Sequence, residues 1–125
     1  MQRAQRLLTQ AVALATLGAV ANATSVYAAD AVAGRTLFRQ QCTICHTAEA
    51  GDSGGAQGPS LQGVYGSRAA SDTSFTYTAA LRSSHLLWDA GNLDRFLEDP
   101  ARSVPGTAMA ISVPAKVDRD NLIAY

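Results

Sequence analysis

The sequence predicts an all-α fold in which a few short helices are joined by long loops. Apolar residues recur at spacings of three and four in short segments along the chain, which is the pattern of amphipathic helices. The glycine-rich stretch in the middle of the chain has no strand signal. The 125 residues leave room for one domain, and 10 basic residues balance 10 acidic ones, so no charge imbalance suggests nucleic acid.

The N-terminal segment is typical of a secretory signal peptide. Two arginines precede an apolar, uncharged run over residues 7–21, and small residues follow. We expect cleavage after Ala28 or after Ala29, so that residues 1–28 form the signal peptide and residues 29–125 form the domain. The alternative is an uncleaved anchor, since an alanine-rich run of this length is close to the lower limit for spanning a bilayer. Cleavage would leave eight basic and ten acidic residues, a mildly acidic chain.

The first predicted helix covers residues 30–41. Asp30 can cap its N-terminus, and the spacing of three and four places four residues on one face, which Cys42 continues. A polar loop is predicted over residues 50–58, and glycines prolong the irregular region to Ser67. The residues on the helix face are Gly34, Leu37, Phe38 and Gln41.

Two helices are predicted in the second half of the chain before a proline-rich loop. A short one covers residues 78–84, and a stronger one covers residues 89–98 and ends before Pro100. The second helix carries an apolar stripe, which we expect to be core. The stripe consists of Leu93, Phe96 and Leu97, and Phe75 is expected in the same core.

The last predicted helix begins at Asp118, which can cap it, after a turn at Pro105-Gly106. Its apolar pattern still runs at Tyr125, so we expect further residues in the natural protein. A domain of under a hundred residues with so much loop buries a modest fraction of its surface, so we expect it to need a core filler. The apolar residues of the helix are Leu122, Ile123 and Tyr125.

The only two cysteines carry the most informative motif. Cys42, Cys45 and His46 form C-T-I-C-H, the attachment signature of c-type haem. Residues three and four apart share a face of a helical turn, so both sulfurs can reach the two vinyl groups of one haem while His46 is delivered to the iron. A covalently attached haem would be the core filler.

Other interpretations of this cysteine pair are a short-loop disulfide, a thiol redox pair or half of a zinc site. Zinc would normally have four ligands, and the chain offers only one other histidine, His85. A thioredoxin-like motif would be expected beside a βαβ pattern, which the sequence lacks. The export signal favours haem, because covalent haem attachment takes place outside the cytoplasm.

Two side chains could fill the sixth position of a haem iron. Met109 is the only thioether that would remain after signal cleavage, and His85 is the only spare imidazole. A lone methionine is more often core filling than a ligand. Here Pro105 and Gly106 place Met109 in a turn-rich loop, V-P-G-T-A-M, instead of on a helix face, and this favours the ligand interpretation.

With these motifs in order, residues 34–125 resemble the class I c-type cytochromes, of the mitochondrial and related bacterial kind. The resemblance implies the small cytochrome c fold, wrapped around one haem c that is covalently bound through Cys42 and Cys45. Beyond the two motifs above, it rests on G-P-S-L at 58–61, F-T-Y-T at 75–78, Trp88, and L-I-A-Y at 122–125.

The resemblance also implies roles for the other site residues. His46 and Met109 would ligate the iron, and the carbonyl of Pro59 would fix the ring of His46. Gly34 and Phe38 would pack against Leu122 and Tyr125. Three residues would hydrogen-bond or neutralise the haem propionates, which are costly to bury unpaired. These are Arg68, Tyr77 and Trp88.

Some positions depart from the family pattern. Phe96 stands where many relatives have a tyrosine near the methionine sulfur, and Leu81 stands where many have an asparagine. Mitochondrial relatives surround the haem edge with lysines, whereas this chain has Ala101, Arg102 and Ala108. These positions do not favour docking to a strongly acidic partner.

The function implied is that of a soluble single-electron carrier of a respiratory chain in the periplasm. It would be a monomer and no enzyme, with no catalytic residues, and would bind neither nucleic acid nor, once the signal is cleaved, a membrane. It would dock transiently on a dehydrogenase or quinol-oxidising complex and on a terminal oxidase or reductase. Alternatives are a haem enzyme or gas sensor with an open iron, a haem subunit of a larger oxidoreductase, and ligation by two histidines through His85.

Overall fold

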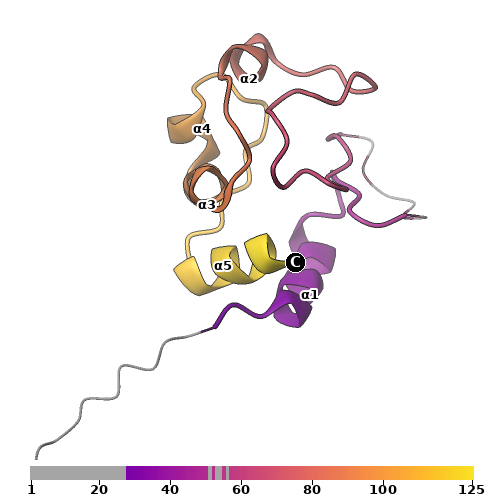
Figure 1. Ribbon diagram of the computed structural model, residues 1–125, viewed down its shortest axis with the longest axis vertical. Coiled ribbons are helices and arrows are strands. Elements are labelled where there is room, and N and C mark those ends of the chain that lie inside the picture. Colours follow the sequence, from indigo (N-terminus) through magenta and orange to yellow (C-terminus); the bar gives the residue numbers. More distant parts are fainter. Residues whose placement is uncertain (1–27, 51, 53–54, 56) are drawn as a thin grey trace, which may run out of the picture.

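The computed structural model describes residues 28–50, 52, 55 and 57–125, so the predicted signal peptide lies outside the described residues apart from Ala28. In this part of the chain the fold is all-α, as predicted, and the only strand-like pairing is a single bridge between Arg68 and Leu87. The helices are α1 (Ala31–Gln41), α2 (Ala79–Ser83), α3 (Ala90–Glu98), α4 (Pro100–Ser103) and α5 (Lys116–Ala124). Figure 1 shows them joined by long loops.

The first helix begins where the sequence predicts. Asp30 caps α1 because its side chain accepts hydrogen bonds from the backbone N–H groups of Val32 and Ala33, at 2.8 and 3.2 Å. Gly34 and Phe38, one turn apart, are the buried residues of the helix, whereas Gln41 is exposed. The predicted face is therefore confirmed over its first two turns and ends before Gln41.

The first and last helices cross at close range (Figure 1). A β-carbon at Gly34 would lie 1.9 Å from the carbonyl oxygen of Asn121, so only glycine permits this approach. The rings of Phe38 and Tyr125 lie 5.6 Å apart, centroid to centroid. The predicted contact between the two helices is thus confirmed, and it brings the chain's end beside the start of the domain.

The middle helices begin at side-chain caps. Thr78 caps α2 by accepting from the N–H of Leu81 at 3.2 Å, and Asp89 caps α3 by accepting from that of Asn92 at 2.7 Å. As predicted, α3 ends before Pro100. The same proline, however, opens the unpredicted single-turn helix α4, because the first position of a helix needs no N–H donor.

The start of the last helix was predicted wrongly. Ala115 is the N-cap of α5 and makes no side-chain cap bond, while Asp118 lies in the first turn, where a carboxylate favours the helix dipole. The buried residues of α5 are Arg119 and Asn121, whereas the apolar residues expected there are only partly buried or exposed. Polar contacts therefore fix much of this helix.

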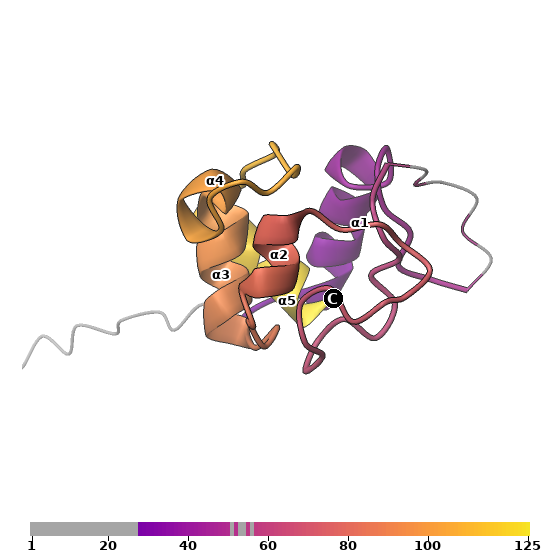
Figure 2. The ribbon, with the colours of Figure 1, turned by 90° about the horizontal axis from the view of Figure 1, so that it is seen from above.

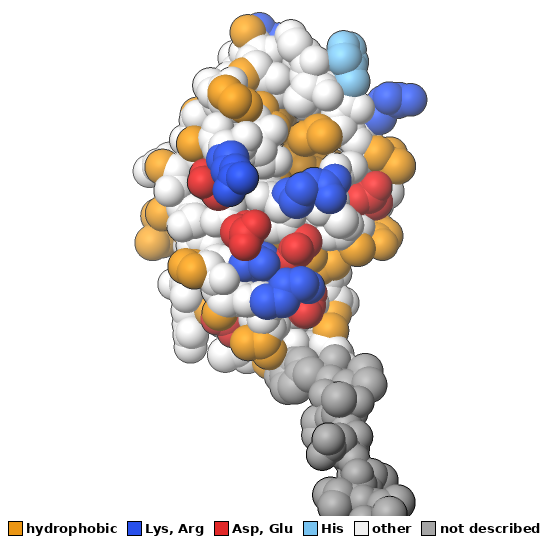
Figure 3. Space-filling model, turned by 90° about the vertical axis from the view of Figure 1, so that its left-hand side faces the viewer, with side chains coloured by type: hydrophobic (Ala, Val, Ile, Leu, Met, Phe, Trp, Pro, Cys, Tyr) orange, Lys and Arg blue, Asp and Glu red, His pale blue; other side chains and the backbone are white. Residues whose placement is uncertain are grey.

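Arg119 is 4% exposed and joins α5 to α3. Its guanidinium donates to a carboxylate oxygen of Asp94 at 2.8 Å and to the backbone carbonyls of Val113 and Pro114 at 3.0 and 2.7 Å. The second carboxylate partner, Glu98, lies 3.5 Å away. Figure 3 shows side chains of both charges gathered on this side of the molecule.

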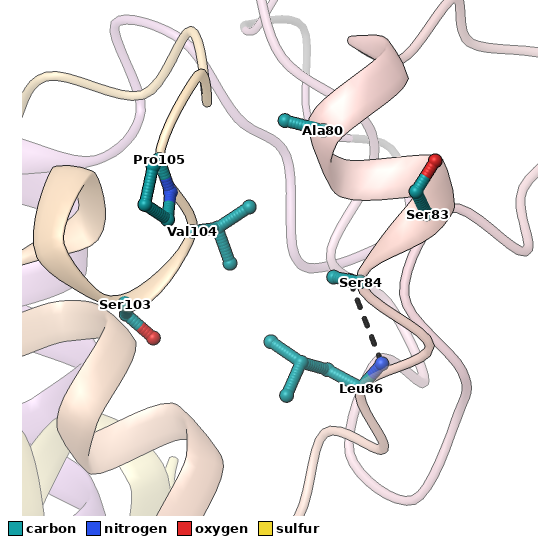
Figure 4. Close-up of a pocket in the computed structure, with 7 residues that line it drawn as sticks. All are labelled: Ala80, Ser83, Ser84, Leu86, Ser103, Val104 and Pro105. Carbon is teal, nitrogen blue, oxygen red and sulfur yellow. Dashed lines mark hydrogen bonds between the residues drawn. The ribbon is translucent and has the colours of Figure 1, made fainter.

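The apolar core is small. Trp88, Phe96 and Val104 form its buried centre, and no described side chain is less than 2% exposed. A pocket of about 230 Å³ that opens to the surface lies between α2 and the turn after α4, and Figure 4 shows Leu86 and Val104 among the side chains that line it. This sparse core agrees with the expectation of a filler. No helix in the described ranges is long and apolar enough to cross a membrane.

Candidate functional site

The cysteines lie on the turn that continues α1. The backbone N–H of Cys42 donates to the carbonyl of Phe38 at 2.8 Å, and the N–H groups of Cys45 and His46 donate to the carbonyl of Cys42 at 3.0 and 2.8 Å. One turn therefore presents both sulfurs and the imidazole together, as the three-and-four spacing predicts.

Both cysteines are partly buried, and no disulfide joins them. Burial raises the pKa of the Cys42 thiol above its usual value, and the neighbouring Cys45 raises it further. The thiol of Cys45 donates to the side-chain oxygen of Gln57 at 3.7 Å. The described residues hold no cluster of three or more His, Cys, Asp or Glu side chains around a common point.

His46 is fixed by the carbonyl oxygen of Pro59, which lies 2.8 Å from its Nδ1. A carbonyl oxygen can only accept a hydrogen bond, so Nδ1 must carry the proton in this contact. The other ring nitrogen, Nε2, then has its lone pair available for a metal. The carbonyl of Pro59 therefore contacts the ring of His46 through Nδ1.

Gly58 contributes a packing surface that the sequence reasoning did not assign. A β-carbon at this position would lie 2.4 Å from Cε1 of His46, so the imidazole rests directly on the glycine backbone. The N–H of Gly58 also donates to the carbonyl of Cys45 at 2.8 Å. Gly58 is the first residue of the G-P-S-L motif, which is the sequence signal for this position.

Met109 lies in a loop that leaves the core through a tight turn. The N–H of Thr107 donates to the carbonyl of Val104 at 3.0 Å, and Gly106 has φ of +93°, which confirms the turn predicted at Pro105-Gly106. Met109 follows, partly buried, and packs against the cluster of Trp88, Phe96 and Val104. His85, by contrast, is exposed.

Arg68 and Trp88 are brought together by backbone pairing. The N–H of Trp88 donates to the carbonyl of Ser67 at 2.9 Å, beside the bridge between Arg68 and Leu87. Trp88 is 7% exposed and its ring centroid lies 5.0 Å from that of Phe96, whereas Arg68 is exposed.

Tyr77 lies on the segment that leads into α2. Its ring meets the ring of Phe75 edge-on at 5.0 Å, and burial raises the pKa of its hydroxyl above the usual value. Among the described residues, no hydrogen bond joins Tyr77 to Arg68 or Trp88.

These groups fit a haem c chemically. Two free thiols share a turn with an imidazole whose Nε2 carries a lone pair, and a thioether lies on the surface of an under-filled apolar core. Imidazole and thioether are both established haem iron ligands.

Comparisons with known proteins agree with this fit. The family model of cytochrome c matches residues 31–125. The chain is 45% identical to cytochrome c of Tetrahymena pyriformis over 97 residues, which cover 77% of this chain and 85% of that protein. It is 38% identical to cytochrome c2 of Rhodomicrobium vannielii over 123 residues, which cover 93% of this chain and 94% of that protein.

A solved structure gives the same result. The structure of cytochrome cH from Methylobacterium extorquens superposes with a TM-score of 0.69 at 36% identity, covering 77% of this chain and 95% of that one. The predicted small cytochrome c fold is thereby confirmed. The cofactor of this chain is haem c, attached through Cys42 and Cys45, and the chain belongs to the cytochrome c family.

Proposed function

We propose that this protein is a single-electron carrier whose haem iron is ligated by His46 and Met109. Haem c supplies one iron that alternates between the ferric and ferrous states. The protein holds both axial positions with its own side chains, leaves no place for a substrate at the iron, and is a carrier and no enzyme.

The observation that carries this proposal is the contact between His46 and Pro59. The 2.8 Å separation of Nδ1 from the carbonyl oxygen holds the proton on Nδ1 and leaves the lone pair of Nε2 available to bind the iron. The backbone of Gly58 packs against the imidazole ring, because the absence of a side chain at this position leaves room for the ring. The proximal ligand is thus set in one tautomer and one orientation.

Met109 supplies the second ligand. A thioether favours the ferrous state, so ligation by histidine and methionine raises the reduction potential. Phe96, which packs in the cluster beside Met109, cannot donate a hydrogen bond to the sulfur. The surroundings of the sulfur are therefore apolar, and the carrier belongs at the oxidising end of an electron-transfer chain.

Arg68, Tyr77 and Trp88 are proposed to bind the haem propionates. Arg68 brings a positive charge next to Trp88 through the backbone pairing, which supports this assignment. A buried propionate needs such partners, since an unpaired buried carboxylate is strongly disfavoured.

The proposed setting is the periplasm. Residues 1–28 would be removed as a signal peptide, and the match to cytochrome c2, which covers 93% of this chain, reaches into that segment. The monomeric protein would take electrons from a dehydrogenase or quinol-oxidising complex and pass them to a terminal oxidase or reductase of a respiratory chain. Such partners dock briefly, and the carrier binds neither nucleic acid nor membrane.

Visible spectra of the purified, haem-loaded protein test the proposal. The ferric form should have the weak sulfur-to-iron band in the red, and the ferrous form should not bind carbon monoxide. Met109→Ala should abolish the band and open the ferrous iron to carbon monoxide, whereas His85→Ala should change neither. Ready carbon monoxide binding by the unmodified protein would instead favour a haem enzyme or gas sensor.

A further inference from the structure

We propose that the surface around Cys42, Cys45 and Met109 docks redox partners whose own docking surface is apolar and uncharged. This surface is called the neutral rim below and consists of the exposed parts of residues 40–48, 57–63 and 104–112. The inference rests on the proposed carrier function and adds to it the chemical class of the partner.

The charge pattern of the sequence is the first observation. No Asp, Glu, Lys or Arg occurs in the nine residues 40–48, the fifteen residues 53–67 or the thirteen residues 103–115. These stretches carry both haem-attaching cysteines, both proposed iron ligands and Pro59. All the charges of the domain therefore belong to other segments.

The three stretches meet in space. The N–H of Leu61 donates to the carbonyl of Thr47 at 2.7 Å, and the N–H of Gly58 donates to that of Cys45 at 2.8 Å, so the first two stretches are joined. Val64 of the second stretch and Met109 of the third stretch pack against the same core cluster. The third stretch therefore lies close to the other two. Figure 2 shows the loop after α4 and the C-terminal end of α1 on the same side of the molecule.

The neutral rim exposes large apolar side chains. Ile44, between the two cysteines, is 72% exposed, and Ile111, two residues after Met109, is 52% exposed. Ala108 and Ala110 beside Met109 are exposed as well. Contacts within the described chain thus leave uncovered two isoleucines that flank the haem-attaching and iron-binding groups.

Arg39 and Glu49 adjoin the rim in the sequence, and Glu49 pairs with Arg35. Many of the other charges lie on the side formed by α3 and α5 (Figure 3). There they are largely neutralised in pairs: Asp94 lies within 2.8 Å of Arg119 and 3.6 Å of Lys116, and Lys116 also pairs with Asp120. This side therefore offers little net charge to steer a partner.

This distribution selects one class of partner. A charged group buried against Ile44 or Ile111 would lose its hydration and gain no opposite charge, which is unfavourable. An apolar partner surface has no charged group whose hydration would be lost. Its binding is favourable because apolar surface on both proteins is removed from water. Because no net charge on the rim attracts or repels the partner, the association rate should not depend on salt.

A second copy of this chain is a well-defined probe, because its own rim is uncharged and exposes the same isoleucines. Electron self-exchange between ferrous and ferric protein oxidises one copy and reduces the other, and NMR exchange spectroscopy measures its rate. Between about 0.01 M and 0.5 M ionic strength we expect this rate to change by no more than about twofold. Backbone amide shifts of the ferric protein at rising concentration should move in residues 40–48 and 104–112.

Charge-addition variants separate the rim from the rest of the surface. Ile44→Lys and Ile111→Lys should each slow self-exchange by roughly tenfold at low salt, because the added positive charges of the two copies repel each other. At high salt the rate should return to that of the unmodified protein. Val32→Lys is the matched control: Val32 is 76% exposed and lies at the other end of α1, about 15 Å along the helix from Cys42. It adds the same charge and should leave the rate within about twofold.

A self-exchange rate that rises tenfold or more with salt in the unmodified protein would overturn the inference. Equal slowing by Val32→Lys and Ile111→Lys would do the same, as would amide shifts confined to α3 and α5. Each of these results leaves the carrier function intact. A protein that cannot be cycled between ferric and ferrous forms would instead refute the proposed function.

Discussion

Gly34 and Asn121 lie in backbone contact, so that a β-carbon on Gly34 would stand 1.9 Å from the carbonyl oxygen of Asn121. The contact is made by backbone atoms on both sides, and neither helix can yield by turning a side chain. The crossing of α1 and α5 therefore depends on a single missing methyl group.

Gly34→Ala should destabilise the haem-loaded protein by about 3 kcal/mol, because the helices must separate to admit the methyl group. Urea unfolding followed by circular dichroism measures the loss. Gly91→Ala is the control, since a β-carbon there would meet no atom closer than 3.6 Å. It lies in a helix and should be neutral or stabilising by up to about 1 kcal/mol. Equal losses in both variants would contradict the close-contact explanation.

Gly58→Ala should displace the ring of His46 and weaken its hydrogen bond to Pro59. The added β-carbon would lie 2.4 Å from Cε1 of His46, closer than any real contact allows. The Nδ1 proton of His46 should then exchange with solvent faster by about tenfold or more, since roughly 1.4 kcal/mol of lost interaction corresponds to a factor of ten. NMR of the loaded protein follows this proton. An unchanged exchange rate, with Gly91→Ala as the reference, would mean that Gly58 does not position the ring.

Glu49 joins the loop after the haem-attachment motif to α1 and to the C-cap residue of α5. Arg35 donates to its two carboxylate oxygens at 2.6 and 2.8 Å, and the hydroxyl of Tyr125 donates at 2.8 Å. The hydrogen bond from Arg35, followed by that from Tyr125, lowers the pKa of Glu49 from 4.5 to about 2. The carboxylate is thus held in its charged form across the whole physiological range.

A carboxylate whose pKa is lower in the folded protein stabilises the fold above its unfolded pKa and loses that effect as the pH falls. Glu49→Gln should therefore lower the urea midpoint at pH 7, and the difference from the unmodified protein should shrink between about pH 4.5 and pH 2. Because the ion pair of Arg35 and Glu49 is exposed to solvent, about 1 M salt should also reduce the difference between the variant and the unmodified protein. A difference that persists unchanged at pH 2 would contradict an ionic origin.

Arg119→Met should destabilise the protein by about 3 kcal/mol, because it leaves Asp94 and two backbone carbonyls without their buried donor. Lys116→Met provides the comparison. Lys116 is also close to Asp94, at 3.6 Å, but its side chain is 61% exposed. Its loss should therefore shift the urea midpoint much less than the loss of Arg119. Urea midpoints measure both, and similar losses would show that burial of Arg119 does not decide its contribution.

Most of the local elements, but not α4 or the start of α5, followed from the sequence alone. Helix caps and apolar spacing act over three or four residues, so they predicted α1 with its Asp30 cap, α2 after Thr78, α3 up to Pro100 and the turn at Pro105-Gly106. The haem-attachment turn followed for the same reason. The error at Asp118 is also local: an acidic residue can serve as a cap or lie in the first turn, and the spacing alone does not separate the two.

Several contacts between distant segments were decided only by the tertiary structure. Gly58 beneath the ring of His46, Arg119 between α5 and α3, and the clamp of Arg35, Glu49 and Tyr125 each join residues that no periodic pattern relates. A sequence pattern reports which face of an element is apolar, because that preference is set by nearby residues. Which atoms meet across two elements depends on how their faces pack, and that is a property of the folded chain.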